Sequence, residues 1–442
     1  MNTDQVQCQK TSLKGGNYRA NQEQISIHRQ PMKNPAQFLR KLILAVTLMV
    51  CGLRASGYAA GGVTAWGYYY DLNFPETYRL MYVPGDLTNV LAIAGGQKHA
   101  LAIKSDGKVV AWGDGTNGKT NVPPSATNVI AIAAGRDHSL ALKSDGTVVG
   151  WGYSSFGAVN VPEGLSNIVA IAAGGGHSMA LKTDGTVSAW GSDLYGPATV
   201  PAGLSNVVAI KAGILDFFSL ALKADGSLVA WGYPHGPYAD FGLTNLPTGL
   251  SNVLGCAAGF YHAMALTSDN TLAPWGSGMS TASPEDHINY GQSTIPSSLS
   301  NVVAMDAQYF HSLALKSDGT VEAWGAGTNV VGGTSLNKGQ SIVPAGLSNV
   351  VAVASGGTFS LAMVGSGPPT SLVALTNYSK TANGFAVTMP AECGRVYRLE
   401  YKAALADSTW TGLPLVAGNG AMLTLTNSPT PDLQGFYRVR RW

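Results

Sequence analysis

The sequence predicts an all-β protein: a seven-bladed β-propeller closed by N- and C-terminal half-blades, followed by a small C-terminal β-sandwich. Three observations lead to this fold. A unit of about 40 residues recurs along most of the chain, and no helix-length amphipathic pattern interrupts it. The repeat array also starts and stops in the middle of a unit, as expected for a ring of blades whose two ends meet.

The repeat is marked by the dipeptide Trp-Gly, which occurs seven times, with its tryptophan at residues 66, 112, 151, 190, 231, 275 and 324. A second recurrent position, the histidine slot, is occupied by His99, His138, His177, Phe218, His262, His311 and Phe359. Each unit reads NVVAIAAG, two variable residues, HSLALKSDGT, VVAWG, a variable loop and VPxGLSN. This period and this strand-rich pattern favour a propeller over an open solenoid.

Each segment of the unit has a local structural meaning. NVVAIAAG is a short apolar run, HSLALK and TVVGW alternate with a period of two, and both patterns are typical of β-strands. The Ser-Asp-Gly between the last two segments predicts a tight hairpin turn, and Asp269-Asn270 takes its place in the fifth copy. We expect a fourth short strand through the VNVP segment, with the proline near its end, where no ladder hydrogen bond is lost.

The two ends of the array complete each other. The array opens at VTAWG (63–67), which lacks the first two strands of a unit, and it ends at NVVAVASGGTFSLAMV (349–364), which lacks the last two. Joined side by side, these fragments make one full blade and leave no sheet edge unpaired. We therefore predict a ring closed by two strands from each end.

Residues 1–60 read as a leader with a signal peptide rather than as part of the fold. Basic residues precede an apolar run over 42–52, and small residues follow it, with Met32 as an alternative start. The run is too short to span a bilayer, so we expect no membrane span in the mature protein. The expected location is secreted or cell-surface.

Three further segments follow the leader. The propeller covers 61–365, a Gly/Pro-rich linker covers 366–371, and a small β-sandwich module covers 372–442. In the last segment Tyr397 and Leu399 alternate with charged residues, as in a strand with one buried face.

Composition and motifs argue against several functions. Lys and Arg number 27 against 25 Asp and Glu, so there is no basic excess to bind nucleic acid. The sequence contains no hydrolase, zinc-protease, redox-cysteine or phosphate-binding motif, and we predict neither an enzyme nor a bound cofactor or metal. The polar cluster Glu285-Asp286-His287 is interpreted as a solvated loop. The recurrent histidine is interpreted as a packing residue with an optional hydrogen bond, because phenylalanine replaces it twice and cannot bind a metal.

The phrase GRDHSLALKSDGTVVGWG (135–152) resembles the regulator of chromosome condensation repeat superfamily in its short bacterial form. The longer pattern VVAWG…GKTNVP…AIAAGRDHSLALK is most similar to that of β-lactamase inhibitory protein II, a secreted member of this superfamily. The resemblance covers 61–365 and implies a seven-bladed propeller. It also implies target binding through aromatic side chains of the loops that follow Trp-Gly. The nuclear nucleotide-exchange role of the superfamily's namesake is disfavoured by the leader.

The loops of the predicted propeller fall on two rims. The constant rim carries the Ser-Asp-Gly turns and the VPxGLSN links, which hardly change between copies. The variable rim carries the two residues before the histidine slot and the loop after Trp-Gly. Aromatic residues gather there with charged residues among them, as at protein-binding hot spots. The candidate partner-binding residues are Tyr69, Tyr70, Arg136, Asp137, Tyr153, Phe156, Tyr195, Asp216, Phe217, Tyr233, Tyr238, Phe260, Tyr261, Tyr309 and Phe310.

Three functions stay open at this point. The leading hypothesis is a monomeric protein-recognition module that binds a macromolecular partner through the variable rim, with inhibition of that partner as one form of the function. The second is a lectin-like binder of cell-wall or extracellular glycans, since exposed tyrosines also stack on sugars. The third is an enzyme whose site forms at the channel mouth from residues of different blades. The aromatic residues also have a purely structural interpretation, in which they cap the propeller and pack on one another.

Overall fold

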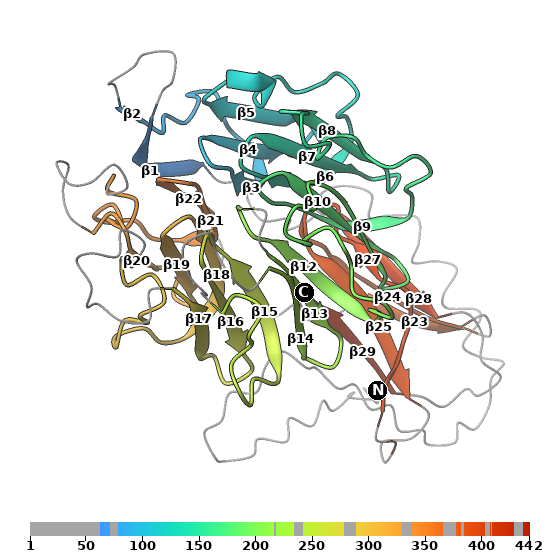
Figure 1. Cartoon of the computed structure of the whole chain (residues 1–442). Helices are drawn as coiled ribbons and strands as arrows, with labels where there is room; N and C mark the ends of the chain where they lie inside the picture. Colours follow the sequence, from blue (N-terminus) through green and yellow to red (C-terminus); the bar gives the residue numbers. More distant parts are fainter. Residues whose placement is uncertain are drawn as a thin grey trace, which may run out of the picture.

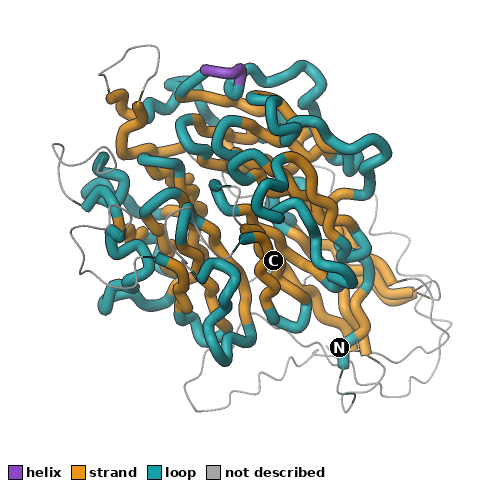
Figure 2. Tube along the Cα trace, in the orientation of Figure 1, coloured by secondary structure: helices purple, strands orange, loops and turns teal. Residues whose placement is uncertain are grey.

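Figure 1 shows short antiparallel sheets arranged around a centre, and Figure 2 shows that almost all regular structure is strand. The structure is a computed structural model that describes residues 62–70, 78–215, 218–233, 242–277, 289–328, 338–365, 377–381, 384–402, 407, 409–427 and 436–442. Within these ranges the only helical turn is the 3-10 turn η2 (Thr116–Gly118). No helix in the same ranges has the length and apolar character needed to cross a membrane.

Six repeat units each form a three-stranded antiparallel sheet in chain order. The strands are β3 (Val90–Gly95), β4 (His99–Lys104) and β5 (Val109–Gly113); β6 (Val129–Ala134), β7 (His138–Lys143) and β8 (Val148–Gly152); β9 (Ile168–Ala173), β10 (His177–Lys182) and β11 (Val187–Gly191); β12 (Val207–Ala212), β13 (Phe218–Lys223) and β14 (Leu228–Gly232); β15 (Val253–Ala258), β16 (His262–Thr267) and β17 (Leu272–Gly276); and β18 (Val302–Gln308), β19 (His311–Lys316) and β20 (Val321–Gly325). The expected hairpin turn joins the second and third strands. Its glycine has a positive φ, as at Gly146 (78°), and Asn270 adopts the same conformation (63°) in the fifth copy.

The closing sheet combines strands from both ends of the array. Its order is β2 (Tyr78–Leu80), β1 (Val63–Tyr70), β22 (Phe359–Val364) and β21 (Val350–Ser355). β1 pairs antiparallel with β22, and Trp66 lies opposite Ser360, as Trp151 lies opposite Ser139 in a complete unit. The predicted pairing of the two incomplete ends is therefore confirmed.

The sheets form a closed ring through their innermost strands. β3 contacts β6, and the contacts continue through β9, β12, β15, β18 and β21 back to β3. Backbone hydrogen bonds also link neighbouring blades: Arg136 N donates to Gly174 O (3.0 Å), and Gly357 N donates to Gly96 O (3.1 Å). The second of these bonds joins the closing sheet to the first complete unit.

The predicted fourth strand is wrong for the six complete units. In the part of the chain that the structure describes, their VNVP segments join no sheet ladder, and the segment after β5 contains a turn in which Asn121 N donates to Gly118 O (2.9 Å). The segment instead contributes a carbonyl to the next blade, where Lys119 O accepts a hydrogen bond from Trp151 Nε1 (2.9 Å). The turn leaves few extended residues, and the proline has no N–H to donate, so a ladder does not form.

The middle strand of each blade explains the monotony of the repeat. All side chains from His138 to Leu142 are buried, and successive side chains of a strand point to opposite faces, so both faces are covered. All seven repeat tryptophans are buried as well, and six of them donate their indole N–H to a carbonyl oxygen. The tryptophans therefore serve packing.

The residues after the linker form two small antiparallel sheets with a common core. One sheet contains β23 (Asn377–Thr381), β24 (Gly384–Pro390) and β28 (Met422–Asn427). The other contains β25 (Val396–Lys402), β26 (Thr411–Gly412), β27 (Val416–Ala417) and β29 (Phe436–Arg441). Side chains from both sheets, among them Val387 and Leu399, belong to one buried apolar cluster.

This C-terminal module contacts the constant rim of the propeller. Gly394 N donates to Ile130 O (2.9 Å), Leu415 N donates to Thr183 O (2.9 Å), and Arg440 Nη1 donates to Ala224 O (2.6 Å). The first acceptor lies near the start of β6, and the other two lie in the turns after β10 and β13. These contacts are at the opposite ends of the strands from the variable rim.

Candidate functional site

The histidine slot joins each blade to the next. His138 Nε2 lies 3.0 Å from Ser178 Oγ of the following blade. Because Ser178 Oγ donates its single proton to Ala158 O (2.9 Å), it accepts the hydrogen bond from His138. The same bond recurs at four other blade junctions, at 2.9–3.1 Å, in the pairs His99–Ser139, His177–Ser219, His262–Ser312 and His311–Ser360.

The two phenylalanines of the slot follow the same rule. Phe218 precedes the blade that carries Ala263 in place of serine, and Phe359 precedes the blade that carries Ala100. Where the next blade offers no hydroxyl, the slot therefore holds an apolar ring. This confirms the interpretation of the histidine as a packing residue with an optional hydrogen bond.

Burial keeps three of the slot histidines, His99, His262 and His311, neutral. It lowers the pKa of His99 and of His262 to about 3, with smaller contributions from Lys119 and His138 near His99 and from His311 near His262. Burial also lowers the pKa of His311 to about 3. A glycine precedes most of these rings for a steric reason, because a Cβ at Gly135 would lie 2.6 Å from His138 Cε1.

The aspartates of the constant rim form hydrogen bonds within their own hairpin turns. The Thr147 hydroxyl and backbone N–H, together with Lys143, donate hydrogen bonds to Asp145 and hold its pKa at about 2. Equivalent Asp–Thr or Asp–Ser bonds stabilise the turns at Asp184, Asp225 and Asp318. These side chains serve hairpin turns.

The variable rim exposes several large apolar side chains on neighbouring blades, which we call the rim arc. Its members are Tyr153 (36% exposed) and Phe156 (55%) after β8, Leu194 (78%) after β11 and Tyr233 (40%) after β14. They come from three consecutive blades. Tyr153 and Phe156 meet edge to face at 5.7 Å, and Tyr233 lies 5.5 Å from the half-buried ring of Tyr195. Leu194 was not among the predicted residues, because the prediction rested on the aromatic and charged residues of the rim.

A second group of predicted residues packs on itself. Phe260 lies 4.4 Å from Tyr261, 4.6 Å from Tyr309 and 5.0 Å from Phe310, measured between ring centroids. Tyr261 and Phe310 are each only 4% exposed, and Tyr69 is 8% exposed, so the expectation that these three face solvent is wrong. The aromatic loops of two adjacent blades bury each other here. The capping interpretation therefore describes this part of the rim.

Polar groups of two non-adjacent blades meet across the ring on the same rim. Gln308 Nε2 donates to Gly95 O (2.6 Å), and Gln97 Nε2 donates to the Tyr309 hydroxyl (3.3 Å). Deeper in, Lys211 lies 4.0 Å from Asp306. Lys211 and Asp306 were not among the predicted residues, although both replace an alanine of the AIAAG pattern and so depart visibly from the repeat.

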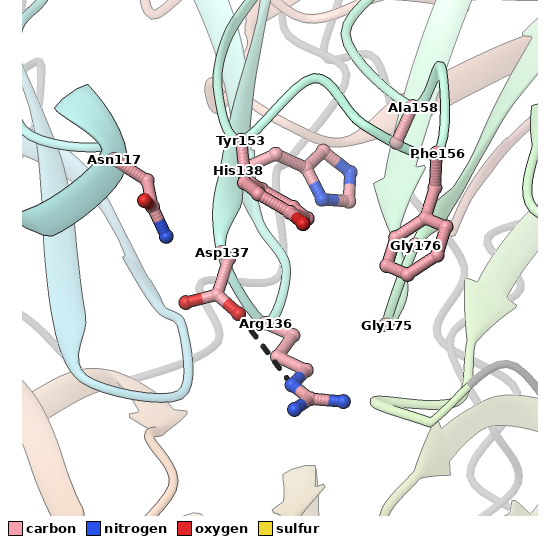
Figure 3. Close-up of a pocket in the computed structure, with 9 residues that line it drawn as sticks. All are labelled: Asn117, Arg136, Asp137, His138, Tyr153, Phe156, Ala158, Gly175 and Gly176. Carbon is pink, nitrogen blue, oxygen red and sulfur yellow. Dashed lines mark ion pairs between the residues drawn. The ribbon is translucent and has the colours of Figure 1, made fainter.

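A pocket of about 310 Å³ opens on the variable rim between two adjacent blades (Figure 3). One blade supplies Arg136 and Asp137 before β7 and the rings of Tyr153 and Phe156 after β8. The next blade supplies Gly175-Gly176 before β10, and the preceding blade adds Asn117 from the loop after β5. The pocket thus combines four predicted site residues with a wall that has no side chains.

A buried ion network supports this pocket. The Lys119 ammonium is 1% exposed and lies 3.0 Å from Asp114 and 2.9 Å from Asp137. Burial acts to raise the pKa of Asp114, but hydrogen bonds from Thr116 and Lys119 outweigh it, and the pKa lies below its usual value. Arg136 is half exposed and pairs with Asp137 through Nε alone, at 3.5 Å.

Some predicted residues lie outside the part of the chain that the structure describes. These are Asp216, Phe217, Tyr238 and the side chain of Tyr70, together with the cluster Glu285-Asp286-His287.

Comparison with known proteins identifies the repeat and the fold. Residues 90–119, 129–158 and 168–196 match the model of the regulator of chromosome condensation (RCC1) repeat. Comparison with curated proteins gives no match. The chain is similar to yeast RCC1 (Prp20) in its crystal structure with Kap60, with a TM-score of 0.53, 20% identity and coverage of 70% of this chain and 90% of that one.

Two further solved structures show the same likeness. Prp20p from Saccharomyces cerevisiae gives a TM-score of 0.53 at 20% identity, over 70% of this chain and 92% of that one. Human WBSCR16 gives 0.51 at 18% identity, over 69% of this chain and 99% of that one. The chain therefore carries regulator of chromosome condensation repeats and has the all-β propeller fold of the RCC1 proteins.

Proposed function

We propose that this chain is an exported, monomeric recognition module that binds a protein partner through the variable rim of its propeller. The observation that carries the proposal is the rim arc: Tyr153, Phe156, Leu194 and Tyr233 are exposed on the same rim of three consecutive blades. Large apolar side chains grouped in this way on a protein surface mark contact sites. Tyrosine and phenylalanine give a wide contact area for little lost rotamer entropy.

The structural relatives support protein binding as the kind of function. Their particular partners are not transferred to this chain. Yeast RCC1 (Prp20) is bound to Kap60 in one structure, and Prp20p has binding properties toward Gsp1p and histones. Identity of 20% carries the fold to this chain but carries no partner. The proposal therefore rests on the rim arc itself.

Capture of partners by the purified chain tests the proposal. Alanine at Tyr153, Phe156 and Tyr233 together should abolish capture of the protein that the unmodified chain retains, because the contact area is removed. The melting temperature should change little, since these side chains are exposed. Tyr82→Ala is the matched control, because Tyr82 is 77% exposed but lies outside the rim arc.

The opposite results contradict the proposal. Capture that survives the triple substitution would place the binding surface elsewhere, and a fall in melting temperature of many degrees would make the rim arc part of the core. The inhibitory form of the function is tested by adding the chain to its captured partner, or to a β-lactamase, and measuring the rate of that enzyme.

Glycan binding is the second candidate, and the exposed rings of the rim arc are what favours it. Aromatic faces stack on sugar rings as well as on protein side chains. A glycan array separates the two functions: retention of cell-wall glycans that is lost in the triple variant supports the lectin-like function, whereas retention of protein alone supports the first.

A further inference from the structure

We propose that the pocket between the blades of β7 and β10 receives an acidic side chain, Asp or Glu, of the protein partner. Arg136 binds the carboxylate, and the rings of Tyr153 and Phe156 pack on the apolar part of the same side chain. This inference rests on the proposed function and adds the chemistry of one partner residue to it.

The pocket exists because of a difference between neighbouring repeats. The two positions before the histidine slot hold Arg136-Asp137 in one blade and Gly175-Gly176 in the next. The corresponding positions in another pair of blades hold Phe260-Tyr261 and Tyr309-Phe310, whose rings fill the space between the blades. Gly-Gly leaves that space open, and the hollow of about 310 Å³ has room for a side chain.

Arg136 is the cation in this pocket that can bind a ligand. Asp137 Oδ1 lies 2.9 Å from the buried ammonium of Lys119, which also pairs with Asp114, so Asp137 has a closer cationic partner than Arg136. Arg136 meets Asp137 only through Nε, and its side chain is 49% exposed. Figure 3 shows that its two terminal nitrogens point away from Asp137, and they have no other partner among the described residues.

Charge and geometry favour a carboxylate over a cation. Of the two charged side chains that line the pocket, Arg136 is 49% exposed and Asp137 is 26% exposed, and Asp137 is also held by Lys119, so the guanidinium is the charge more open to a ligand. The planar fork of a guanidinium matches the two oxygens of a carboxylate and binds them in parallel. The neighbouring rings shield this pair from water, which strengthens it relative to a fully solvated one. A partner lysine or arginine would meet the exposed guanidinium of Arg136 and be repelled by it.

A random peptide library displayed on phage tests this site with the full chain as bait. Peptides retained by the unmodified chain and lost on Phe156→Ala should share an Asp or Glu. Arg136→Gln should weaken the dissociation constant of such a peptide by tenfold or more in fluorescence polarisation. Changing the acidic residue of the peptide to its amide should cause a similar loss, and the two losses should not add. Arg136→Lys should restore part of the affinity.

Two controls isolate the pocket. Lys143→Gln removes a cation of the same blade at its constant rim and should leave binding unchanged. Gly175→Arg with Gly176→Asp rebuilds the preceding blade's residues in the pocket wall and should abolish binding. The dissociation constant of a variant is interpreted only if its melting temperature equals that of the unmodified chain.

The outcomes separate this inference from the proposed function. Peptides that depend on Phe156 but tolerate Arg136→Gln, or that carry no common acidic residue, overturn the inference and leave the proposed function in place. A library from which no peptide distinguishes the unmodified chain from the triple rim-arc variant overturns both.

Discussion

The hydrogen bond from His138 to Ser178 is expected to stabilise the propeller by about 1–2 kcal/mol, and a double-mutant cycle measures this contribution. Both side chains are buried, at 1% and 0% exposure, and the bond joins two blades. Ser178→Ala leaves the imidazole N–H without a partner in the interior, which should cost about 1–3 kcal/mol of unfolding free energy. Ala158 O keeps its second hydrogen bond, from Trp190 Nε1 (2.8 Å), so the loss falls on the histidine.

The double variant His138→Phe with Ser178→Ala reproduces a junction that the chain already contains, that of Phe218 with Ala263. It should recover most of the stability lost in Ser178→Ala, because no polar group is then left buried and unpaired. The reverse exchange, Phe218→His with Ala263→Ser, should also be tolerated. Leu243 O already accepts a hydrogen bond from Trp275 Nε1 and can accept a second one from the new serine hydroxyl.

Urea unfolding followed by circular dichroism and by tryptophan fluorescence gives the four free energies of the cycle. A coupling energy near zero, with the two single losses simply adding in the double variant, would refute the idea that the slot residues of adjacent blades act as a pair. A Ser178→Ala loss below about 0.5 kcal/mol would show that the imidazole finds another partner.

Three further predictions follow from buried charge and from the position of the C-terminal module. The three slot histidines with a pKa of about 3 take up protons when the chain unfolds below pH 6.5. As the pH is lowered from 6.5 towards 3, the unfolding free energy should therefore fall by up to roughly 1.4 kcal/mol per pH unit for each histidine. Urea unfolding at pH 7 and pH 5 checks this, and equal stability at the two pH values would contradict it. Lys119→Met leaves Asp114 buried beside an apolar chain and should cost about 3–5 kcal/mol, seen as a clear drop in melting temperature, whereas Lys108→Met at the exposed pair with Asp106 should not. Arg440→Ala removes the hydrogen bond to Ala224 O and should speed proteolytic release of the C-terminal module; an unchanged rate would show that the other contacts alone hold it.

The sequence predicted the repeating parts of this molecule well because those parts are local. Alternation with a period of two placed the strands, Asp-Gly placed the hairpin turns, and the incomplete units at both ends predicted the pairing of β1 with β22. The prediction of a fourth strand was wrong for the six complete units, because its short apolar pattern says nothing about whether backbone groups find a ladder partner. The link between the histidine slot and the serine of the next repeat is also visible in the sequence. Histidine occurs where the next repeat has a serine after its own slot residue, and phenylalanine occurs where the next repeat has an alanine there.

The candidate site was less predictable, as its aromatic residues show. Tyr153 and Tyr261 are the same residue type on the same rim, yet one is 36% exposed and the other 4%. The difference arises from the neighbouring loop, which brings Phe310 against Phe260 and Tyr261 but brings only glycines toward Tyr153. The exposure of a rim side chain depends on two loops from different repeats, and the sequence of one loop alone does not show what the other loop places against it.

The sequence by itself determined the strands, the turns, the order of the blades and the meeting of the two ends, because these follow from periodicity along the chain. Only the tertiary structure decided which rim residues face solvent, where the C-terminal module docks, and that Gly175-Gly176 stands opposite Arg136. Each of these depends on side chains from different blades meeting in space, where packing and desolvation act, and no spacing within a single repeat encodes such a meeting.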